Sequence, residues 1–370
     1  MRVLVAPDTF AGTLTAVEAA EAIAEGWRRT TADEVSTVPM ADGGPGFVDV
    51  LHAAIGGEIL AVTVRGPLGS AVPATLLVAD GTAYIEAAQA SGVSLLPSAG
   101  TAPARGVVED ASTYGVGELV AEAVAAGARK IVVGLGGSGT NDGGAGLLAA
   151  LGATSEPPGA LTAGVTGLSY LAEVDLEPAR ARLAGFEIVA ATDIDNPLLG
   201  LRGATNVFGP QKGVATDRLI EVDGALTRFA HLAGRQPADA RGAGAAGGLG
   251  YALMLLGARR EPGFVMVADA VKLRAAIRAA DLVLTGEGKL DWQSMSGTVV
   301  SGVAGLAGEA MRPCVVIAGI VQVGSRELRA NGIESAYSLV DVVGARTART
   351  DPAESLATVA ARVARTWSRR

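Results

Sequence analysis

A run of apolar residues that ends in acids stands at residues 186–198, which read FEIVAATDIDNPL. The run from Phe186 to Ala191 predicts a buried strand of an α/β sheet, so Asp193 and Asp195 emerge at its carboxyl end, where such sheets bind ligands. Two acids one residue apart suit a hard cation such as Mg²⁺, which also takes phosphate oxygens as ligands. Lys212, in the segment VFGPQKG at 207–213, could then offset the charge of a phosphoryl group. In isolation, an Asp-x-Asp pattern is equally typical of a turn or a helix cap.

Length and composition predict a folded chain of roughly two domains, because 370 residues with 49% hydrophobic and only 4% aromatic content are typical of a compact α/β enzyme. The net charge is −8 and basic residues are dispersed except at 365–370, which argues against a nucleic-acid partner. No uninterrupted apolar run reaches the ~18–20 residues of a membrane span, and the chain enters a strand without the features of a signal peptide. Cys314 is the single cysteine, which excludes internal disulfides and thiolate metal clusters. We therefore expect a cytoplasmic protein with no membrane partner, and the oligomeric state stays open, a homo-oligomer included.

Short apolar runs alternate with amphipathic segments along most of the chain, which predicts a parallel sheet covered by helices on both faces. The clearest of these are strands at 3–6, 35–40, 130–134, 281–285 and 314–318, and helices at 15–29, 116–126, 217–233 and from about 352. The helix at 15–29 is expected to be capped at Thr13 or Thr15, and Glu18, three residues after Thr15, predicts a capping box. Three β-rich segments joined by Gly and Pro turns interrupt the alternation, at 59–64, 72–78 and 82–86. The interruption predicts a second, differently built domain inserted into the first.

Two glycine-rich loops are candidates for binding phosphate or carboxylate groups. The loop GLGGSG at 134–139 follows a predicted strand and matches the dinucleotide pattern G-x-G-x-x-G. The ribose-binding acid expected about 20 residues further on is missing, since only Glu156 stands there, beside two prolines; this argues against a nicotinamide cofactor. The second loop, GAGAAGG at 242–248, predicts either phosphate binding or a tight packing turn, and no Walker-type motif is present. The candidate phosphate-binding residues are Gly136, Gly137, Ser138, Gly244 and Gly247.

Acidic residues beside glycines follow other predicted strands as well. They occur in APDTF at 6–10, PMADGG at 39–44 and TGEGKLDWQS at 285–294. Each segment alone could be a solvated turn, but five such strand ends at one edge of a sheet predict a ligand site. The two histidines, His52 and His231, stand in helix-like context, so many acids with little histidine favour metal-assisted phosphoryl transfer over histidine-dependent hydrolysis.

Taken in order, these motifs resemble those of the bacterial glycerate kinases of the first type, which phosphorylate D-glycerate with ATP. The segments that carry the resemblance are 6–8, 39–44, 65–69, 112–115, 136–146, 193–198, 207–213, 242–250 and 285–291. The resemblance covers nearly the whole chain and implies a Rossmann-like parallel-sheet domain, residues 1–70 plus 275–370, with a second α/β domain, residues 71–274, inserted into it. It also implies an active-site cleft between the two domains, Mg·ATP as phosphoryl donor and 2-phosphoglycerate as product.

The resemblance and the chemistry of the residues together suggest a role for each. As a hypothesis, Asp193 orients the acceptor hydroxyl and takes its proton, or shares a Mg²⁺ ion with Asp195, while Lys212 offsets charge on the transferring group. The residues expected to bind the hydroxy substrate are Asp8, Asp42, Asn141, Asp142, Glu287, Lys289 and Asp291.

Three positions depart from the pattern of the family. Ala11 and Thr298 stand where lysines are usual, and Pro45 stands where a glutamate is usual. Each lost charge-assisted hydrogen bond would typically cost ~1.5–3 kcal/mol. Three interpretations stay open: a D-glycerate kinase, a kinase with a less anionic acceptor in specialised metabolism, and a weak relative that binds its ligand without turnover. We prefer an active kinase, because the chain retains Asp193, Asp195, Lys212, Glu287, Lys289 and Asp291.

Overall fold

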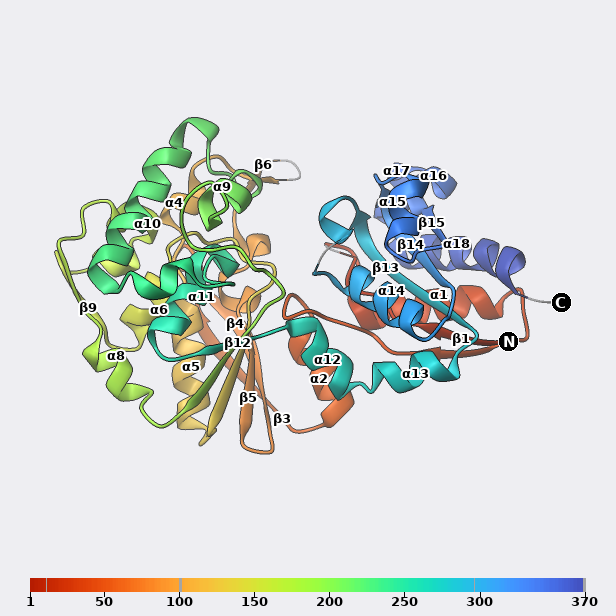
Figure 1. Cartoon of the computed structure of the whole chain (residues 1–370), viewed down its shortest axis with the longest axis horizontal. Helices are drawn as coiled ribbons and strands as arrows, with labels where there is room; N and C mark the ends of the chain where they lie inside the picture. The colour runs from red at the N-terminus through yellow and green to blue at the C-terminus, as the bar shows by residue number, and fades with distance from the viewer. Residues whose placement is uncertain (11, 100–101, 296, 369–370) are drawn as a thin grey trace. The chain divides into compact units, whose positions relative to one another are not determined.

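A computed structural model describes residues 1–10, 12–99, 102–295 and 297–368 (Figure 1). By their contacts these residues form two compact units: unit 1 holds residues 1–42, 49–55 and 264–370, and unit 2 holds residues 43–48 and 56–263. The sequence predicts the domain boundaries at 70–71 and 274–275. The contacts place both boundaries earlier in the chain. At the first boundary this is because the strand Glu58–Arg65 pairs within the sheet of unit 2. The cleft expected between the domains stays a prediction.

Unit 1 is built on a five-stranded parallel sheet in the order β15-β14-β13-β1-β2. Counted in chain order within the unit, this is the 2-1-3-4-5 order of a doubly wound sheet, in which the strand order reverses between β1 and β13. The predicted α/β class with a Rossmann-like parallel sheet is therefore confirmed. The strands are β1 (Arg2–Val5), β2 (Glu34–Thr37), β13 (Leu282–Leu290), β14 (Cys314–Val321) and β15 (Ser335–Ser338).

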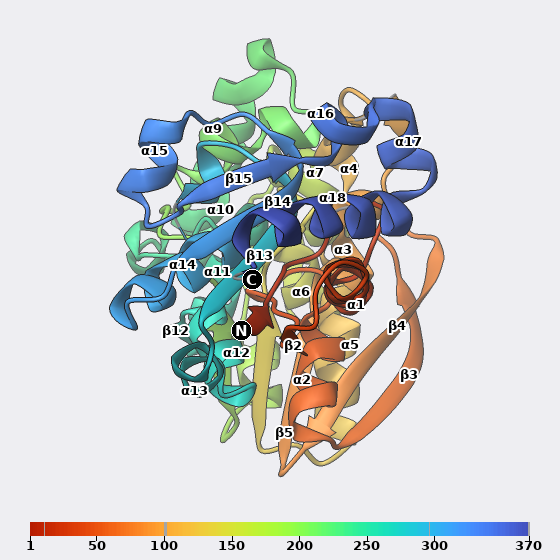
Figure 2. The ribbon, with the colours of Figure 1, turned by 90° about the vertical axis from the view of Figure 1, so that its right-hand side faces the viewer.

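Helices α1 (Ala16–Arg28) and α18 (Pro352–Trp367) lie side by side and cover one face of this sheet (Figure 2). The predicted capping box opens α1, since Thr15 Oγ1 accepts from Glu18 N (3.2 Å) and the Glu18 carboxylate accepts from Thr15 N (2.8 Å). The backbones of α1 and α18 come very close at Gly26, where an added Cβ would lie only 2.0 Å from Ala357 O. The other helices of the unit are most of α2 (Phe47–Ile55) and α12 (Gly263–Ala270), then α13 (Leu273–Ala279), α14 (Val299–Glu309), α15 (Ser325–Ala330), α16 (Leu339–Val343) and α17 (Ala345–Thr350).

Unit 2 is built on a six-stranded mixed sheet in the order β12-β11-β8-β5-β4-β3. The four strands from β12 to β5 are parallel, and β4 runs antiparallel to both of its neighbours. The three β-rich segments predicted from the sequence are β3, β4 and β5 of this sheet. Its strands are β3 (Glu58–Arg65), β4 (Ala71–Ala79), β5 (Thr82–Glu86), β8 (Lys130–Gly134), β11 (Glu187–Ala191) and β12 (Arg259–Glu261).

Four helices supply most of the helical core of unit 2: α5 (Tyr114–Ala125), α6 (Ala145–Ala150), α10 (Leu219–Ala233) and α11 (Ala245–Leu255). Phe229 and Tyr251 pack edge to face in this core, with ring centres 5.8 Å apart. Within the described ranges, none of the helices combines the length and the apolar character that a bilayer crossing needs. The short elements are β6 (Ser98–Ala99), β7 (Ala102–Pro103), β9 (Thr154–Glu156), β10 (Glu173–Asp175), α3 (Ala88–Ser91), α4 (Val107–Asp110), α7 (Gly164–Leu168), α8 (Glu177–Arg182) and α9 (Ala204–Phe208).

Gly26→Ala should destabilise unit 1, because the added methyl group would collide with the Ala357 carbonyl where α1 meets α18. We expect the free energy of unfolding to fall by about 1–3 kcal/mol, the usual cost of overpacking. Gly305→Ala is the matched control, since Gly305 lies in α14 and a Cβ there meets nothing within 4 Å. It should gain up to about 1 kcal/mol from helix propensity. Equal stabilities in urea titrations of the two variants would contradict the close approach.

Candidate active site

In unit 1 the candidate residues gather where the strand order reverses. The segment after β1 still runs beside β13, because Asp8 N donates to Gly286 O (2.8 Å). Met40 N donates to Pro7 O (2.9 Å), which aligns the segment after β2 with the segment after β1. Ligands of doubly wound sheets bind at such a reversal, so the acids that follow β1 and β2 stand at the edge expected for a site.

Three carboxyl groups of unit 1, which we call the carboxyl cluster, influence one another: Asp8, Asp42 and Glu287. Burial raises the pKa of Asp8 well above its ordinary value, and the negative charges of Asp42 and Glu287 raise it further, against a 2.7 Å hydrogen bond from Thr9 N. Burial also raises the pKa of Glu287 to about 7, with Asp291 and Asp42 adding to the shift. Within the described residues, the buried Glu287 Oε1 has no hydrogen-bond partner. The cluster therefore holds protons near neutral pH that isolated carboxylates would release.

The turn after Glu287 carries the predicted residues Lys289 and Asp291. Lys289 Nζ contacts Asp291 Oδ2 (2.7 Å), and the Lys289 side chain is 54% exposed. Asp291 N donates to Ser294 Oγ (3.1 Å), which in turn donates to Lys289 O (3.2 Å). The two charges offset each other within the turn, so the pair offers a ligand little net charge.

The glycine-rich loop of unit 2, residues 134–144, runs from β8 to α6 and is organised by Asp142. The buried carboxylate of Asp142 accepts hydrogen bonds from Thr113 N and Oγ1 (both 2.8 Å), Gly144 N (2.9 Å) and Gly146 N (3.1 Å). The last two amides belong to the start of α6, so Asp142 caps that helix. Because protein donors occupy both of its oxygens, the geometry favours a positioning role for Asp142 over the substrate contact predicted from the sequence.

Lys212 ends the short 3₁₀ turn Pro210–Lys212 and is buried beside the glycine-rich loop, with 6% of the residue exposed. Its Nζ donates to Thr140 O (2.8 Å). Burial lowers the pKa of Lys212 to about 8, and the charge of Asp142 opposes the shift. An ammonium has three N–H bonds, and among the described residues Thr140 O is the one acceptor it contacts. Two N–H bonds are thus left for an anionic ligand.

Asn141 follows Thr140 in the loop and is fully buried. Its Nδ2 donates to Thr205 Oγ1 in α9 (2.9 Å), whereas its Oδ1 has no partner among the residues that the structure describes. An unpaired buried amide oxygen typically costs ~1–3 kcal/mol. The oxygen can therefore accept from a further hydrogen-bond donor, such as a substrate hydroxyl or a water molecule, and the substrate-binding role of Asn141 stays a prediction.

The glycine-rich loop also packs directly on the segment Gly43-Gly44-Pro45 of the same unit. A Cβ on Gly136 would lie 2.3 Å from Gly44 Cα, and Gly136 N donates to Gly43 O (3.0 Å). A Cβ on Gly137, which has a φ of +71°, would lie 2.8 Å from Pro45 Cδ. Backbone contact thus accounts for both glycines, and the Gly136 amide predicted to bind phosphate already has a protein acceptor.

Ser138 connects this loop to the second one. Its Oγ lies 3.0 Å from Thr140 Oγ1, accepts from Thr140 N (3.2 Å) and donates to Ala246 O (3.4 Å). The predicted phosphate contact of Ser138 would compete with these bonds.

The second glycine-rich loop is held by the segment after β11. Gly244 N donates to Asn196 O (2.9 Å), and a Cβ on Gly244 would lie 2.2 Å from Pro197 O. Inside α11, the residues Ala246, Gly247 and Gly248 have φ values of 52°, 67° and 95°; we call them the left-handed turn. The sequence left two interpretations of this loop open, phosphate binding and a tight packing turn. These contacts favour the packing turn.

Asp193 and Asp195 follow β11 as predicted, but their surroundings differ. Asp193 is half-buried. Asp195 is 49% exposed, and its two oxygens contact Arg260 Nη2 (2.8 Å) and the guanidinium of Arg241. These guanidinium groups hold the pKa of Asp195 below its usual value, against a smaller effect of burial. Because arginines engage both Asp195 oxygens, the residues do not fit the predicted Mg²⁺ site shared by the two acids.

A search of the described ranges finds no group of three or more His, Cys, Asp or Glu side chains placed to hold a metal ion. A Mg²⁺ ion that arrives with a nucleotide keeps phosphate and water ligands and needs only one or two carboxylates. Asp193 stays a predicted ligand of such an ion.

Several polar residues of the site were missed by the sequence reasoning. Glu86 ends β5, is buried, and accepts from Gly46 N through Oε2 (3.0 Å); its signal was an acid at the end of an alternating strand. Thr113 and Thr205 position Asp142 and Asn141. Thr113 stands in the segment 112–115 that carries the family resemblance, but neither threonine was predicted as a site residue, because each stands far along the chain from the residue it holds.

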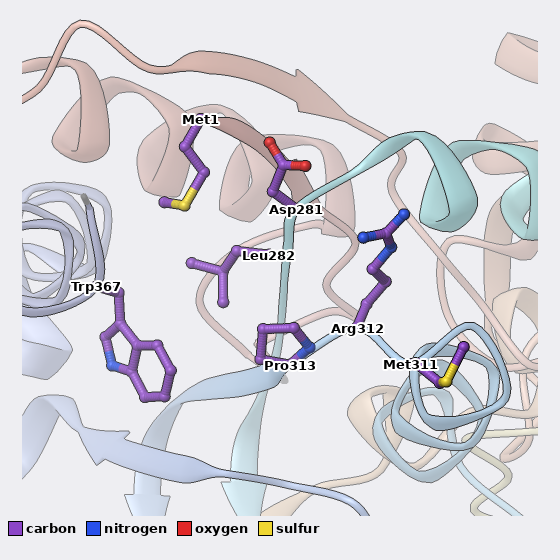
Figure 3. A pocket seen from close by; sticks show the side chains of 7 residues that line it. All are labelled: Met1, Asp281, Leu282, Met311, Arg312, Pro313 and Trp367. Carbon is purple, nitrogen blue, oxygen red and sulfur yellow. The ribbon is translucent and has the colours of Figure 1, made fainter.

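A separate cavity of about 510 Å³ lies at the opposite edge of the unit 1 sheet, where β13 and β14 begin (Figure 3). Asp281 beside it pairs with Arg2 (3.3 Å), and Arg312 Nη2 donates to Arg278 O (3.0 Å). The cavity contains none of the predicted site residues. Its lining residues are Met1, Asp281, Leu282, Met311, Arg312, Pro313 and Trp367.

Comparison with known proteins connects this geometry to a family. A model of the glycerate kinase family matches residues 3–368. The chain belongs to the glycerate kinase family. It is therefore a phosphotransferase with an alcohol group as acceptor, which confirms the predicted enzyme class.

Relatives within the glycerate kinase family cover nearly all of the chain. The glycerate kinase of Bacillus subtilis (strain 168) is 41% identical over 350 residues, which span 92% of this chain and 90% of the relative. The glycerate 2-kinase of Escherichia coli (strain K12) is 38% identical over 354 residues, which span 93% and 92%. A solved structure from Salmonella typhimurium LT2, assigned as glycerate kinase 2, superposes with a TM-score of 0.74 at 38% identity and covers 99% of this chain and 98% of its own.

Two of the three departures from the glycerate kinase pattern have structural roles here. Thr298 caps α14, since its Oγ1 accepts from Ser301 N (3.4 Å) and donates to Ser294 O (2.8 Å). Pro45 is exposed and lies against the glycine-rich loop at Gly137. Ala11 lies outside the described residues.

Glu287→Gln should alter how the stability of this glycerate kinase depends on pH. A carboxyl group with an ordinary pKa of 4.5 and a folded pKa of about 7 binds more protons when folded, so the free energy of unfolding falls as pH rises through that window. Above pH 7 the raised pKa of Glu287 lowers the free energy of unfolding by on the order of 2–3 kcal/mol. We expect the glutamine variant to exceed the parent in stability at pH 8 and much less at pH 5, measured by urea unfolding. The same advantage at both pH values would contradict the raised pKa.

Asp142→Asn should lower the free energy of unfolding by about 2–4 kcal/mol, because an amide nitrogen would face hydrogen-bond donors in a buried position. Asp195→Asn is the matched control from the neighbouring motif. Its exposed ion pairs should contribute about 1 kcal/mol or less. Thermal unfolding of the two variants distinguishes them, and a similar loss in both would argue against the positioning role of Asp142.

Proposed function

We propose that this member of the glycerate kinase family transfers the γ-phosphoryl group of ATP to the 2-hydroxyl of D-glycerate and releases 2-phosphoglycerate and ADP. The similarity to the Escherichia coli glycerate 2-kinase over 93% of the chain supports the choice of acceptor and of its position. The observation that carries the chemistry is the buried Lys212 ammonium, which donates to one carbonyl oxygen and has two further N–H bonds without an acceptor among the described residues.

In the proposed reaction, a bond forms between the hydroxyl oxygen and the γ-phosphorus while the bond to the bridging oxygen of ADP breaks. Negative charge spreads over the phosphoryl oxygens as this happens, so catalysis rests on positioning and on cations. Lys212 supplies such a cation in a site that excludes water, where its charge is more effective than in bulk solvent. Asn141 Oδ1 accepts the hydrogen of a substrate hydroxyl and so orients it.

The hydroxyl proton needs an acceptor, and we assign it to Asp193 at the end of β11. Mg²⁺ bound with ATP would neutralise phosphate charge. Holding this ion is the alternative role of Asp193, in place of accepting the proton, since Asp195 keeps its arginine partners. Asp193→Asn should lose orders of magnitude in kcat with an intact fold, and activity near that of the parent would overturn both roles.

The experiment that tests the proposal is ADP release from Mg·ATP with D-glycerate, followed by ³¹P NMR of the product. We expect turnover and a phosphate ester at the 2-position. A panel of uncharged and amino polyols tests the less anionic acceptor, which activity on a polyol without activity on D-glycerate would support. ATP binding without turnover on any hydroxy compound would overturn the kinase proposal. The Lys212→Met variant serves as the blank for contaminating kinases.

Lys212→Met should lower kcat by at least 100-fold with little change in fold, because the variant keeps the length of the side chain and loses its charge. In the parent, deprotonation of Lys212 should reduce kcat above a pKa of about 8. Lys212→Arg, which stays charged, should shift that decline to higher pH. A parent profile that stays flat from pH 7 to 10 would show that the lysine charge is not required.

A further inference from the structure

The left-handed turn of α11 contacts the carbonyl that holds Lys212. Thr140 O accepts the hydrogen bond from Lys212 Nζ (2.8 Å). A Cβ added to Gly247 would lie 2.0 Å from that same oxygen and 2.7 Å from Asn141 Cα. No real Cβ contact is so short, so a side chain at Gly247 and the Thr140 carbonyl cannot occupy their present places together.

Two hydrogen bonds fix the turn to the glycine-rich loop around this contact. Gly143 N donates to Gly247 O (2.9 Å), and Ser138 Oγ donates to Ala246 O (3.4 Å). Ala246 has a φ of 52° and a ψ of 40°, a left-handed conformation that is strained for a residue with a Cβ. Such strain persists only where the surroundings determine the backbone, which here are the bonds to the loop.

We propose that Gly247 is a positioning residue for the lysine of the reaction: its missing side chain lets the Thr140 carbonyl reach the Lys212 ammonium. The role rests on the proposed function only in so far as Lys212 takes part in catalysis. It replaces the phosphate contact that the sequence predicts for Gly247. Asp142 is the charged group whose electric field acts on Lys212. The variants Gly247→Ala and Gly257→Ala both keep Asp142.

The test compares Gly247→Ala with Gly257→Ala. Both glycines belong to unit 2 and have left-handed φ values, +67° and +89°, so both variants bear the same kind of backbone strain. Only Gly247 has atoms in the way, because a Cβ on Gly257 meets nothing within 4 Å. We expect Gly247→Ala to lose at least tenfold in kcat for D-glycerate, and Gly257→Ala to stay within twofold of the parent.

A second readout needs no substrate. The lysines of the chain are Lys130, Lys212, Lys272 and Lys289, so NMR of selectively labelled lysine side chains can follow Lys212, assigned by the signal lost in Lys212→Met. In the parent its pKa should be about 8. Gly247→Ala should move that pKa by half a unit or more, downward through loss of the acceptor or upward through entry of water, and Gly257→Ala should leave it unchanged.

The two readouts keep the proposals apart. An unchanged Lys212 pKa in folded Gly247→Ala would overturn the positioning role, whatever the activity. A parent without kinase activity would overturn the proposed function and leave the pKa test standing. If Gly247→Ala does not fold, Ser138→Ala weakens the same contact without adding an atom, and a Lys212 pKa identical to that of the parent would count against the proposal.

Discussion

Contact between backbones, with no side chain in between, is the constraint on which the candidate site of unit 2 depends. Gly136 lies on Gly44, Gly244 on Pro197 and Gly247 on Thr140, each at a distance that a Cβ would make impossible. These contacts bring the loops after β8 and β11 together with the start of α11. Because Thr140 lies at one of them, the place of the Lys212 ammonium follows from the packing of main chain rather than from the lysine itself.

The acidic site of unit 1 depends on a different constraint, the reversal of strand order between β1 and β13. Segments that follow neighbouring parallel strands at a reversal diverge and leave a crevice in which polar groups collect. Asp8 follows β1 and Glu287 lies in the adjacent β13, and burial at this reversal keeps protons on groups that water would ionise. The same electrostatics lower the stability of the fold at alkaline pH, where Glu287 loses its proton.

The glycine-rich motifs show both the reach and the limit of sequence reasoning. Their position after strands of an α/β sheet was predictable, because a break in apolar periodicity marks the strand end. The purpose of these glycines was not predictable from the sequence. A glycine that admits a phosphate and a glycine that admits another backbone look alike in one dimension, and at Gly136 and Gly244 the amides donate to carbonyls of distant segments. Asp195 illustrates the same limit, since neither Arg241 nor Arg260 is close to it in sequence.

By itself, the sequence determined the α/β class, the alternation of strands and helices, the cap of α1 at Thr15 and the family to which the chain belongs. All of these depend on residues near one another along the chain or on the order of motifs. Only the tertiary structure decided that Asp142 caps α6 beside Thr113, that Asn141 keeps an unpaired oxygen, and that Lys212 is buried against Thr140. The segments that bury a side chain and supply its hydrogen-bond partners are far apart in the chain. These surroundings determine the pKa of a titratable group and therefore its charge.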